Sequence, residues 1–261
     1  MSLEILTIIG LILQIATFVA LIILTARDMA GIEFTPLVAF FALGMASFLL
    51  SDLYWLAFTL LESDARMPFA VNEIGECACI LLLATAMRSQ LTGAPKRGPR
   101  DILPPALFTL CNVALWIGWS GEWAQDVVSG LALGYYLVIA VGLLKQEAAL
   151  SHREWGALGT TAVLLVALQA LTFAVGDHAR SILDAVCTAL MALSILLAFA
   201  KSVIALRRGS RAALPLTFGS FGWTLVCLYM SAGVFWLVIA MCVTLVFPLM
   251  YLAVRRRVMV S

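Results

Sequence analysis

Charged side chains are scarce in this sequence of 261 residues, where Asp, Glu, Lys and Arg together make up 12% of the chain. A soluble domain has roughly 25% charged and about 45–50% apolar residues, whereas 63% of this chain is hydrophobic and its mean hydropathy is +1.06. The composition excludes a soluble globular domain, a disordered chain and a secreted disulfide scaffold. The net charge of +1 provides no basic field, so we expect no nucleic-acid partner.

Polar segments long enough for a soluble domain are also missing, because no stretch between apolar runs exceeds about 15 residues. The chain lacks a Walker loop, a dinucleotide fingerprint and the HExxH and GxSxG motifs. Its two histidines, His152 and His178, are expected on opposite sides of the membrane, which excludes a haem held by two histidines of one chain. The six cysteines all lie in apolar segments, and no cofactor is indicated.

The apolar segments are long enough to cross a bilayer, which takes about 20 residues of α-helix at about 1.5 Å per residue. We expect one all-α transmembrane domain over 1–261. The last two spans come from one uncharged run, 212–254, which we divide at the turn-forming residues Ser231, Ala232 and Gly233. The nine predicted spans are about 5–26, 35–61, 67–88, 102–121, 126–144, 155–176, 179–200, 212–230 and 234–254.

Basic residues are expected almost entirely on one side of the membrane, and only Arg66 and Arg180 fall on the other. Because Lys and Arg are retained on the cytoplasmic side, the N-terminus is predicted outside and the C-terminus inside. An eight-span alternative would place 255–257 outside, which favours nine spans. The first segment has no basic n-region or cleavage site, so we expect a retained helix. The protein is expected in the cell (inner) membrane, with the lipid bilayer around it.

Two stretches are alike at an offset of 111 residues: 97–100 reads Arg-Gly-Pro-Arg and 208–211 reads Arg-Gly-Ser-Arg, and in each copy Leu-Pro follows after two further residues. The same offset places Glu73 on Asp184. A parallel repeat with halves 35–145 and 146–257 would leave one helix unpaired and place a site between two four-helix halves. The alternative is that basic loops followed by proline recur from topology alone.

Acidic residues gather toward the predicted outer side. A charge near the centre of a bilayer costs about 2.5–3.5 kcal/mol on insertion scales, so a retained one usually has a function or a partner. Glu73 and Glu76 share a helix face at i, i+3, and Asp52 and Asp184 reach similar predicted depths. We expect these four carboxylates at an outward-opening cavity. The alternative is a set of structural pairs in which Arg66 neutralises Glu73 and Arg180 neutralises Asp184.

Several polar and aromatic residues are candidates for the same site. The chain has only two asparagines, and Asn72 lies next to Glu73, where its amide would orient carboxylates or a ligand or form an interhelical hydrogen bond. The second span adds Trp55, and the first and sixth add Gln14 and Gln169. For a metal ion the sequence offers only weak candidates, namely Glu76, His178 and Asp184.

The leading interpretation is a small multi-pass transporter or permease whose acidic site binds a proton, a cation or a cationic solute. Asp52, Glu73, Glu76 and Asp184 would carry the charge, with Asn72, Gln169 and Trp55 beside them. A second hypothesis is an intramembrane enzyme that acts on a lipid-like substrate with two carboxylates or a metal. A third is a membrane sensor or subunit whose basic inner surface docks a cytoplasmic or membrane partner chain.

Overall fold

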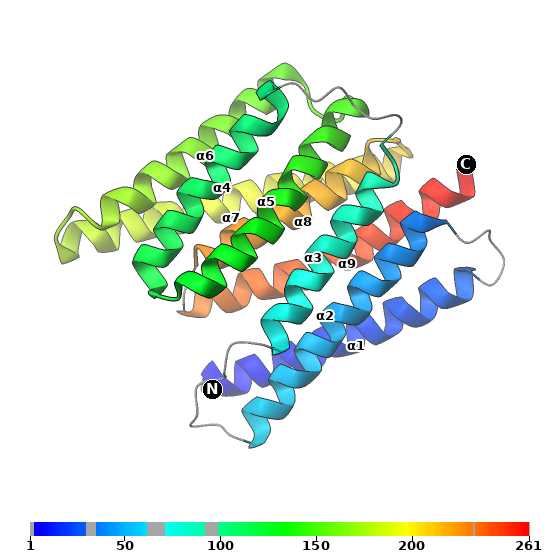
Figure 1. Ribbon diagram of the computed structural model, residues 1–261, viewed down its shortest axis with the longest axis horizontal. Coiled ribbons are helices and arrows are strands. Elements are labelled where there is room, and N and C mark those ends of the chain that lie inside the picture. The colour runs from blue at the N-terminus through cyan, green and yellow to red at the C-terminus, as the bar shows by residue number, and fades with distance from the viewer. Residues whose placement is uncertain (1–2, 30–34, 62–70, 92–98, 232, 261) are drawn as a thin grey trace.

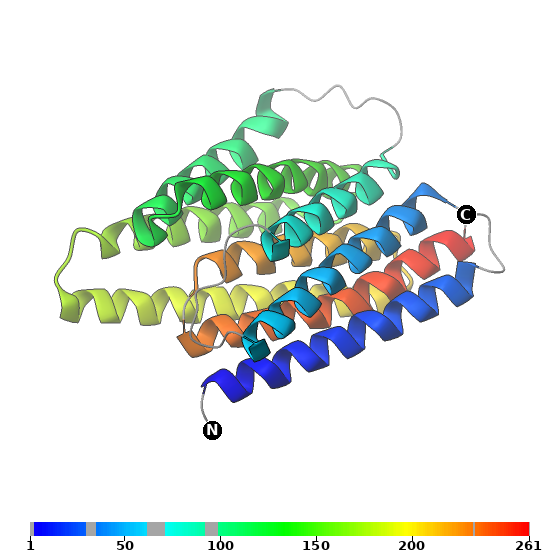
Figure 2. The same cartoon turned by 60° about the horizontal axis from the view of Figure 1, so that its bottom comes forward.

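The computed structural model describes residues 3–29, 35–61, 71–91, 99–231 and 233–260, and within these ranges it contains helices and no strands. The described helices run up and down as a bundle (Figures 1 and 2). They are α1 (Leu3–Met29), α2 (Pro36–Leu61), α3 (Val71–Arg88), α4 (Pro99–Ser120), α5 (Trp123–Gln146), α6 (His152–Thr172), α7 (Asp177–Arg208), α8 (Ala213–Tyr229) and α9 (Gly233–Val260).

Seven of the helices in the described part are long and apolar enough to cross a membrane, namely α1, α2, α4, α5, α6, α7 and α9. The central α8 is apolar but has only 17 residues, and α3 carries two glutamates within its 18 residues. The protein is therefore an all-α, multi-pass integral membrane protein, as the composition predicts. The expected division of 212–254 is also present, because α8 ends at Tyr229 and α9 starts at Gly233.

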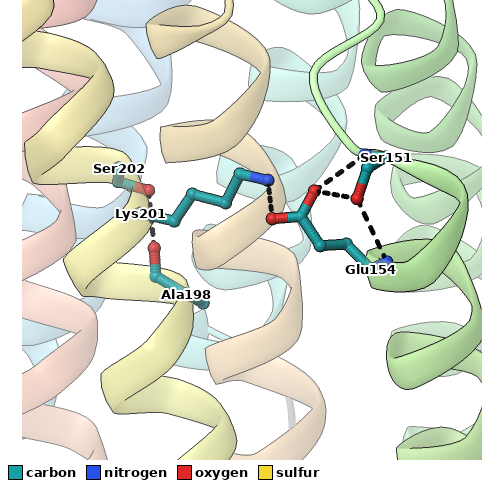
Figure 3. Close-up of polar contacts among 5 residues, drawn as sticks. All are labelled: Ser151, Glu154, Ala198, Lys201 and Ser202. Atoms are coloured by element: carbon teal, nitrogen blue, oxygen red, sulfur yellow. Dashed lines mark hydrogen bonds and ion pairs between the residues drawn. The ribbon is translucent and has the colours of Figure 1, made fainter.

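The beginning of α6 is fixed by a capping box that Figure 3 shows. The Ser151 hydroxyl accepts a hydrogen bond from the Glu154 backbone N–H at 3.4 Å, and the Glu154 carboxylate accepts one from the Ser151 backbone N–H at 2.7 Å. This arrangement satisfies N–H groups that the first helical turn leaves unpaired. The same carboxylate forms an ion pair with Lys201, so the cap also joins α6 to α7.

Helix α8 forms the centre of the bundle, and most of its residues are buried. It packs against α5, α7 and α9, which lie around it in Figures 1 and 2. A Cβ on Gly222 would lie 2.8 Å from Cε1 of Tyr136, so the glycine allows α5 and α8 to approach closely. The buried Tyr136 hydroxyl donates to the carbonyl of Phe218 at 2.7 Å. The core therefore depends on a late segment of the chain.

The ion pairs between described residues all lie at the end of the bundle that the charge pattern predicts to be cytoplasmic. Alternating helix directions bring the end of α1, the start of α4, the α5–α6 connection and the ends of α7 and α9 together there. The basic residues at this end of the bundle are thus partly neutralised by acids at the same end. The orientation of the protein in the membrane stays a prediction. The pairs are Lys145–Asp101, Lys201–Glu154, Arg255–Asp28 and Arg257–Glu147.

The predicted repeat halves would comprise α2–α5 and α6–α9. Within each, helices adjacent in the chain pack together, such as α2 with α3, α4 with α5, α6 with α7 and α8 with α9. Neighbouring helices do this in any bundle with short connections. The packing therefore does not distinguish a duplication from an ordinary up-and-down bundle, and the internal repeat stays a prediction.

Candidate functional site

A cavity of about 210 Å³ lies among α1, α2, α3, α5, α8 and α9. A space of roughly 10–15 Å³ of this kind holds one water molecule, so the cavity has room for several waters or a small solute. Its polar lining consists of three acids and two amides, together with a threonine and a tyrosine, and the remainder is mainly apolar. The acids and amides are Asp52, Glu73, Glu76, Gln14 and Gln125, and the aromatic residues are Phe48, Trp55, Tyr229 and Trp236.

Asp52 is the most deeply buried of the three acids. It lies on the core-facing side of α2, and only 2% of the residue is exposed. Its Oδ2 atom is buried and has no hydrogen-bond partner among the residues that the structure describes, and its carboxyl is close enough to Glu76 for the two to repel each other when ionised. Such an unpaired buried acceptor is rare in a native structure and is more often found at functional sites than elsewhere.

Close packing of α2 against α3 brings Asp52 and Glu76 to the same cavity. A Cβ on Gly75 would lie 3.0 Å from the carbonyl oxygen of Ser47 and 3.0 Å from Cβ of Ser51, so any larger residue would push the helices apart. Small residues at such contacts let backbones approach closely in membrane bundles. Because Ser51 precedes Asp52 and Gly75 precedes Glu76, this contact fixes the depth at which the two acids meet.

Two amide side chains tie the cavity wall together. Gln125 on α5 donates from Nε2 to Oε1 of Glu73 at 3.2 Å, which links α5 to α3. Gln14 on α1 donates from Nε2 to the carbonyl of Ala240 on α9 at 3.1 Å. Both amides line the cavity, and their hydrogen bonds hold them in fixed positions.

Aromatic rings form another part of the wall. The rings of Trp55 on α2 and Trp236 on α9 lie 5.3 Å apart with an interplanar angle of 57°. Tyr229 at the end of α8 also lines the cavity and lies within electrostatic range of Glu76. The faces of such rings attract cations, and tryptophan does so most strongly. The wall thus combines carboxylates with aromatic rings, and both groups favour positive charge.

The described residues that line the cavity include no lysine, arginine or histidine. An ionised carboxylate taken out of water is costly unless a counter-charge and hydrogen bonds compensate. For Asp52 and Glu76 no ion pair is formed with any residue that the structure describes. Chemically, this arrangement suits a proton or a cation as the missing counter-charge.

The predicted site residues divide into two groups. Asp52, Trp55, Glu73 and Glu76 line the cavity together. Asp184 is exposed on α7 and Gln169 is half-buried on α6, and neither belongs to the lining because α6 and α7 contribute nothing to it. The side chain of Asn72 lies outside the residues whose side chains are described, as does all of Arg66.

Among the polar and aromatic lining residues, sequence reasoning missed Thr7, Phe48, Gln125, Tyr229 and Trp236. Gln125 was detectable as an uncharged polar residue at the start of a span. It lies on α5, which only α4 separates in sequence from the two glutamates of α3. Tyr229 and Trp236 flank the turn between α8 and α9, where aromatic residues are expected from the membrane interface alone. Their positions in the sequence therefore gave no separate signal of a cavity.

The weak metal candidates do not meet in the described structure. His178 and Asp184 are exposed on α7, whereas Glu76 lies on α3 and faces the cavity. Across the described ranges no group of three or more His, Cys, Asp or Glu side chains is arranged to hold a metal ion.

The fold and cavity define a multi-pass α-helical membrane protein with an acidic, aromatic-walled cavity between its helices. Comparisons with models of protein families, with curated proteins and with solved structures found no match for this chain.

Proposed function

We propose that the protein is a small membrane permease that binds a proton, a cation or a cationic solute in the cavity lined by Asp52, Glu73 and Glu76. The observation that carries the proposal is that Asp52, Glu73 and Glu76 line one solute-sized cavity whose described lining has no basic residue. The buried Oδ2 atom of Asp52 also has no hydrogen-bond partner among the described residues. A cation in this cavity would provide the counter-charge that the lining lacks. It would also relieve the repulsion between Asp52 and Glu76.

The aromatic part of the wall favours a cationic ligand in addition to the negative charge of the carboxylates. A cation within about 6 Å of an aromatic ring face gains roughly 0.5–2 kcal/mol, with the larger values in desolvated sites. Trp55 and Trp236 line the cavity from α2 and α9, on helices that reach it from opposite ends of the sequence. A small organic cation in this cavity would have both the rings and the carboxylates in its surrounding wall, whereas a proton would use the carboxylates alone.

The position of the cavity suits access from the predicted outer side. Asp52 precedes the end of α2 at Leu61 by nine residues, or about 14 Å of helix, and Glu76 lies five residues after the start of α3. Both helix ends face away from the basic end of the bundle. The lining comes from α2, α3 and α5 in one predicted half and from α8 and α9 in the other. Rocking of these two groups would alternately open and close the cavity.

The test is uptake by the purified protein in liposomes. A panel of protons, Na⁺, K⁺ and tetramethylammonium is offered at the outside, and uptake is followed with a pH-sensitive dye or radiolabelled cation. We expect Glu76→Gln to abolish the uptake that the wild type shows, because the variant keeps the side-chain shape and loses the charge. Size-exclusion chromatography and circular dichroism check that the variant is folded.

Asp184→Asn is the matched control, because it removes an acidic charge from an exposed position outside the cavity. We expect this variant to transport at the wild-type rate. Unchanged uptake by Glu76→Gln would remove that carboxylate from the mechanism. Absence of uptake of every cation in the panel by the wild type would contradict the permease proposal itself.

A further inference from the structure

A second cavity, of about 300 Å³, opens at the opposite, basic end of the bundle. Its walls come from the α7–α8 connection, the last turns of α9 and the residues that follow α3. The described part of the polar lining is dominated by guanidinium groups and contains no acidic residue. The lining residues are Gln90, Gly209, Ser210, Arg211, Ala213, Leu214, Ala253, Arg256 and Arg257.

Two of the three arginines are held in place by the protein. Arg256 donates from Nη1 to the carbonyl of Leu206 at 2.8 Å, which is a contact with a neutral group, and it forms no ion pair with a described residue. Arg257 donates from Nε to Oε1 of Gln90 at 3.3 Å and from Nη2 to Oε1 of Glu147 at 2.9 Å. Only Arg257 is therefore neutralised by a described carboxylate, and the cavity keeps an excess positive charge.

The backbone around Gly209 makes room for one of these groups. Gly209 ends α7 with φ of 68°, a left-handed conformation that glycine adopts without steric cost. A Cβ at this position would lie 2.0 Å from Nη2 of Arg256. The glycine therefore allows both the left-handed turn and the close approach of the Arg256 guanidinium.

The same cavity receives the start of α8, the buried central helix. Ala212 at its N-cap has no side chain that bonds the first turn, and the first turn contains no acidic residue. The N-terminus of a helix carries a partial positive charge and favours an anion. The Ala213 N–H already donates to the carbonyl of Ser210 at 3.1 Å and Pro215 has no N–H, so the helix start contributes its partial charge rather than a row of donors. This partial charge adds to that of Arg211 and Arg256, which line the same space.

We propose that this cavity binds a phosphate group, either from an anionic lipid headgroup or from a soluble phosphate compound. A guanidinium matches two phosphate oxygens with two parallel N–H donors, and several arginines around one cavity are a typical phosphate site. The apolar residues Ala213, Leu214 and Ala253 form the rest of the wall and suit a group at the membrane interface. Basic pockets at the cytoplasmic ends of transmembrane helices bind anionic lipids in this way.

The experiment measures lipid and phosphate binding by the purified full-length protein. Native mass spectrometry counts bound phosphatidylglycerol against phosphatidylcholine at equal concentrations. In a second arm, thermal unfolding in detergent compares sodium phosphate with sodium chloride at equal ionic strength. A preference for phosphatidylglycerol identifies a lipid headgroup as the source, whereas stabilisation by inorganic phosphate identifies a soluble compound. Either result supports the site, and the absence of both overturns it.

Variants then connect binding to this cavity. The double substitution Arg211→Gln and Arg256→Gln is expected to lower the affinity for the bound phosphate compound about tenfold or more. Each substitution removes a charge-assisted hydrogen bond to the phosphate. Arg153→Gln is the control, since Arg153 is exposed and does not line the cavity. Should the double variant fail to fold, Arg211→Gln alone suffices, because Arg211 is exposed and forms no hydrogen bond within the described part of the chain. Equal binding by wild type and folded variants overturns the proposal.

Discussion

Replacing Asp52 by Asn distinguishes a carboxylate kept for a ligand from one kept for the fold. Asparagine has nearly the same shape, so the cavity of about 210 Å³ persists while the repulsion from Glu76 is removed. A buried polar atom without a partner costs roughly 1–3 kcal/mol, and Asp52 already carries such an atom. We therefore expect Asp52→Asn to leave the free energy of unfolding unchanged or to raise it by up to about 1 kcal/mol.

The same substitution should remove the stabilisation that a bound cation confers. A ligand at 100 times its Kd raises the free energy of unfolding by about 2.7 kcal/mol, which corresponds to a rise of roughly 5 °C or more in Tm. The assay is thermal unfolding in detergent, followed by tryptophan fluorescence, with the cation that the uptake panel identifies. We expect the rise in Tm for the wild type and for Asp184→Asn, and its loss in Asp52→Asn.

A structural role for Asp52 gives the opposite pattern. If Asp52→Asn lowers the free energy of unfolding by more than about 1 kcal/mol and keeps the cation-dependent rise in Tm, the carboxylate supports the fold and the reasoning is refuted. Loss of both stability and binding is resolved with Asp52→Glu, which restores the charge. Recovery of binding by that variant would support the ligand role.

Two further substitutions test the packing that builds the cavity. Gly75→Val should separate α2 from α3, because a Cβ at this position already lies 3.0 Å from Ser47 and Ser51. We expect the free energy of unfolding to fall by about 1–3 kcal/mol and cation binding to weaken. Tyr136→Phe removes the hydrogen bond to Phe218 but leaves the ring in place. We expect the free energy of unfolding to fall by about 1 kcal/mol and cation binding to stay unchanged. Thermal unfolding and the uptake assay check both, and a wild-type Tm for Gly75→Val would contradict the proposed close contact.

The helices were largely predictable because span length and loop charge follow directly from the bilayer. The division of 212–254 at Ser231 is one example, since an apolar run of that length cannot form one span and the structure has two helices there. The end of α7 was not predicted, because the seventh span was expected to stop near 200, whereas the helix continues to Arg208 and is capped by Gly209. Hydropathy marks where the apolar run ends, and this helix continues past that point through basic residues.

The composition of the cavity was only partly predictable, because hydropathy gives the depth of a residue and not the direction in which it points. Asp52 and Asp184 have similar predicted depths, yet Asp52 faces the cavity and Asp184 is exposed on α7. A helix that is apolar all round shows no stripe that marks its buried face. The i, i+3 spacing of Glu73 and Glu76 gave the relative direction of those two side chains, and both line the cavity.

The place of α8 in the chain has a consequence for biosynthesis. The helix that α5, α7 and α9 surround is the eighth of the nine described. We therefore expect Tyr136 and Leu144 on α5 to pack against Gly222 and Gly219 only after most of the polypeptide has been synthesised. Final closure of the bundle, and with it the acidic cavity, is thus a late event in membrane insertion.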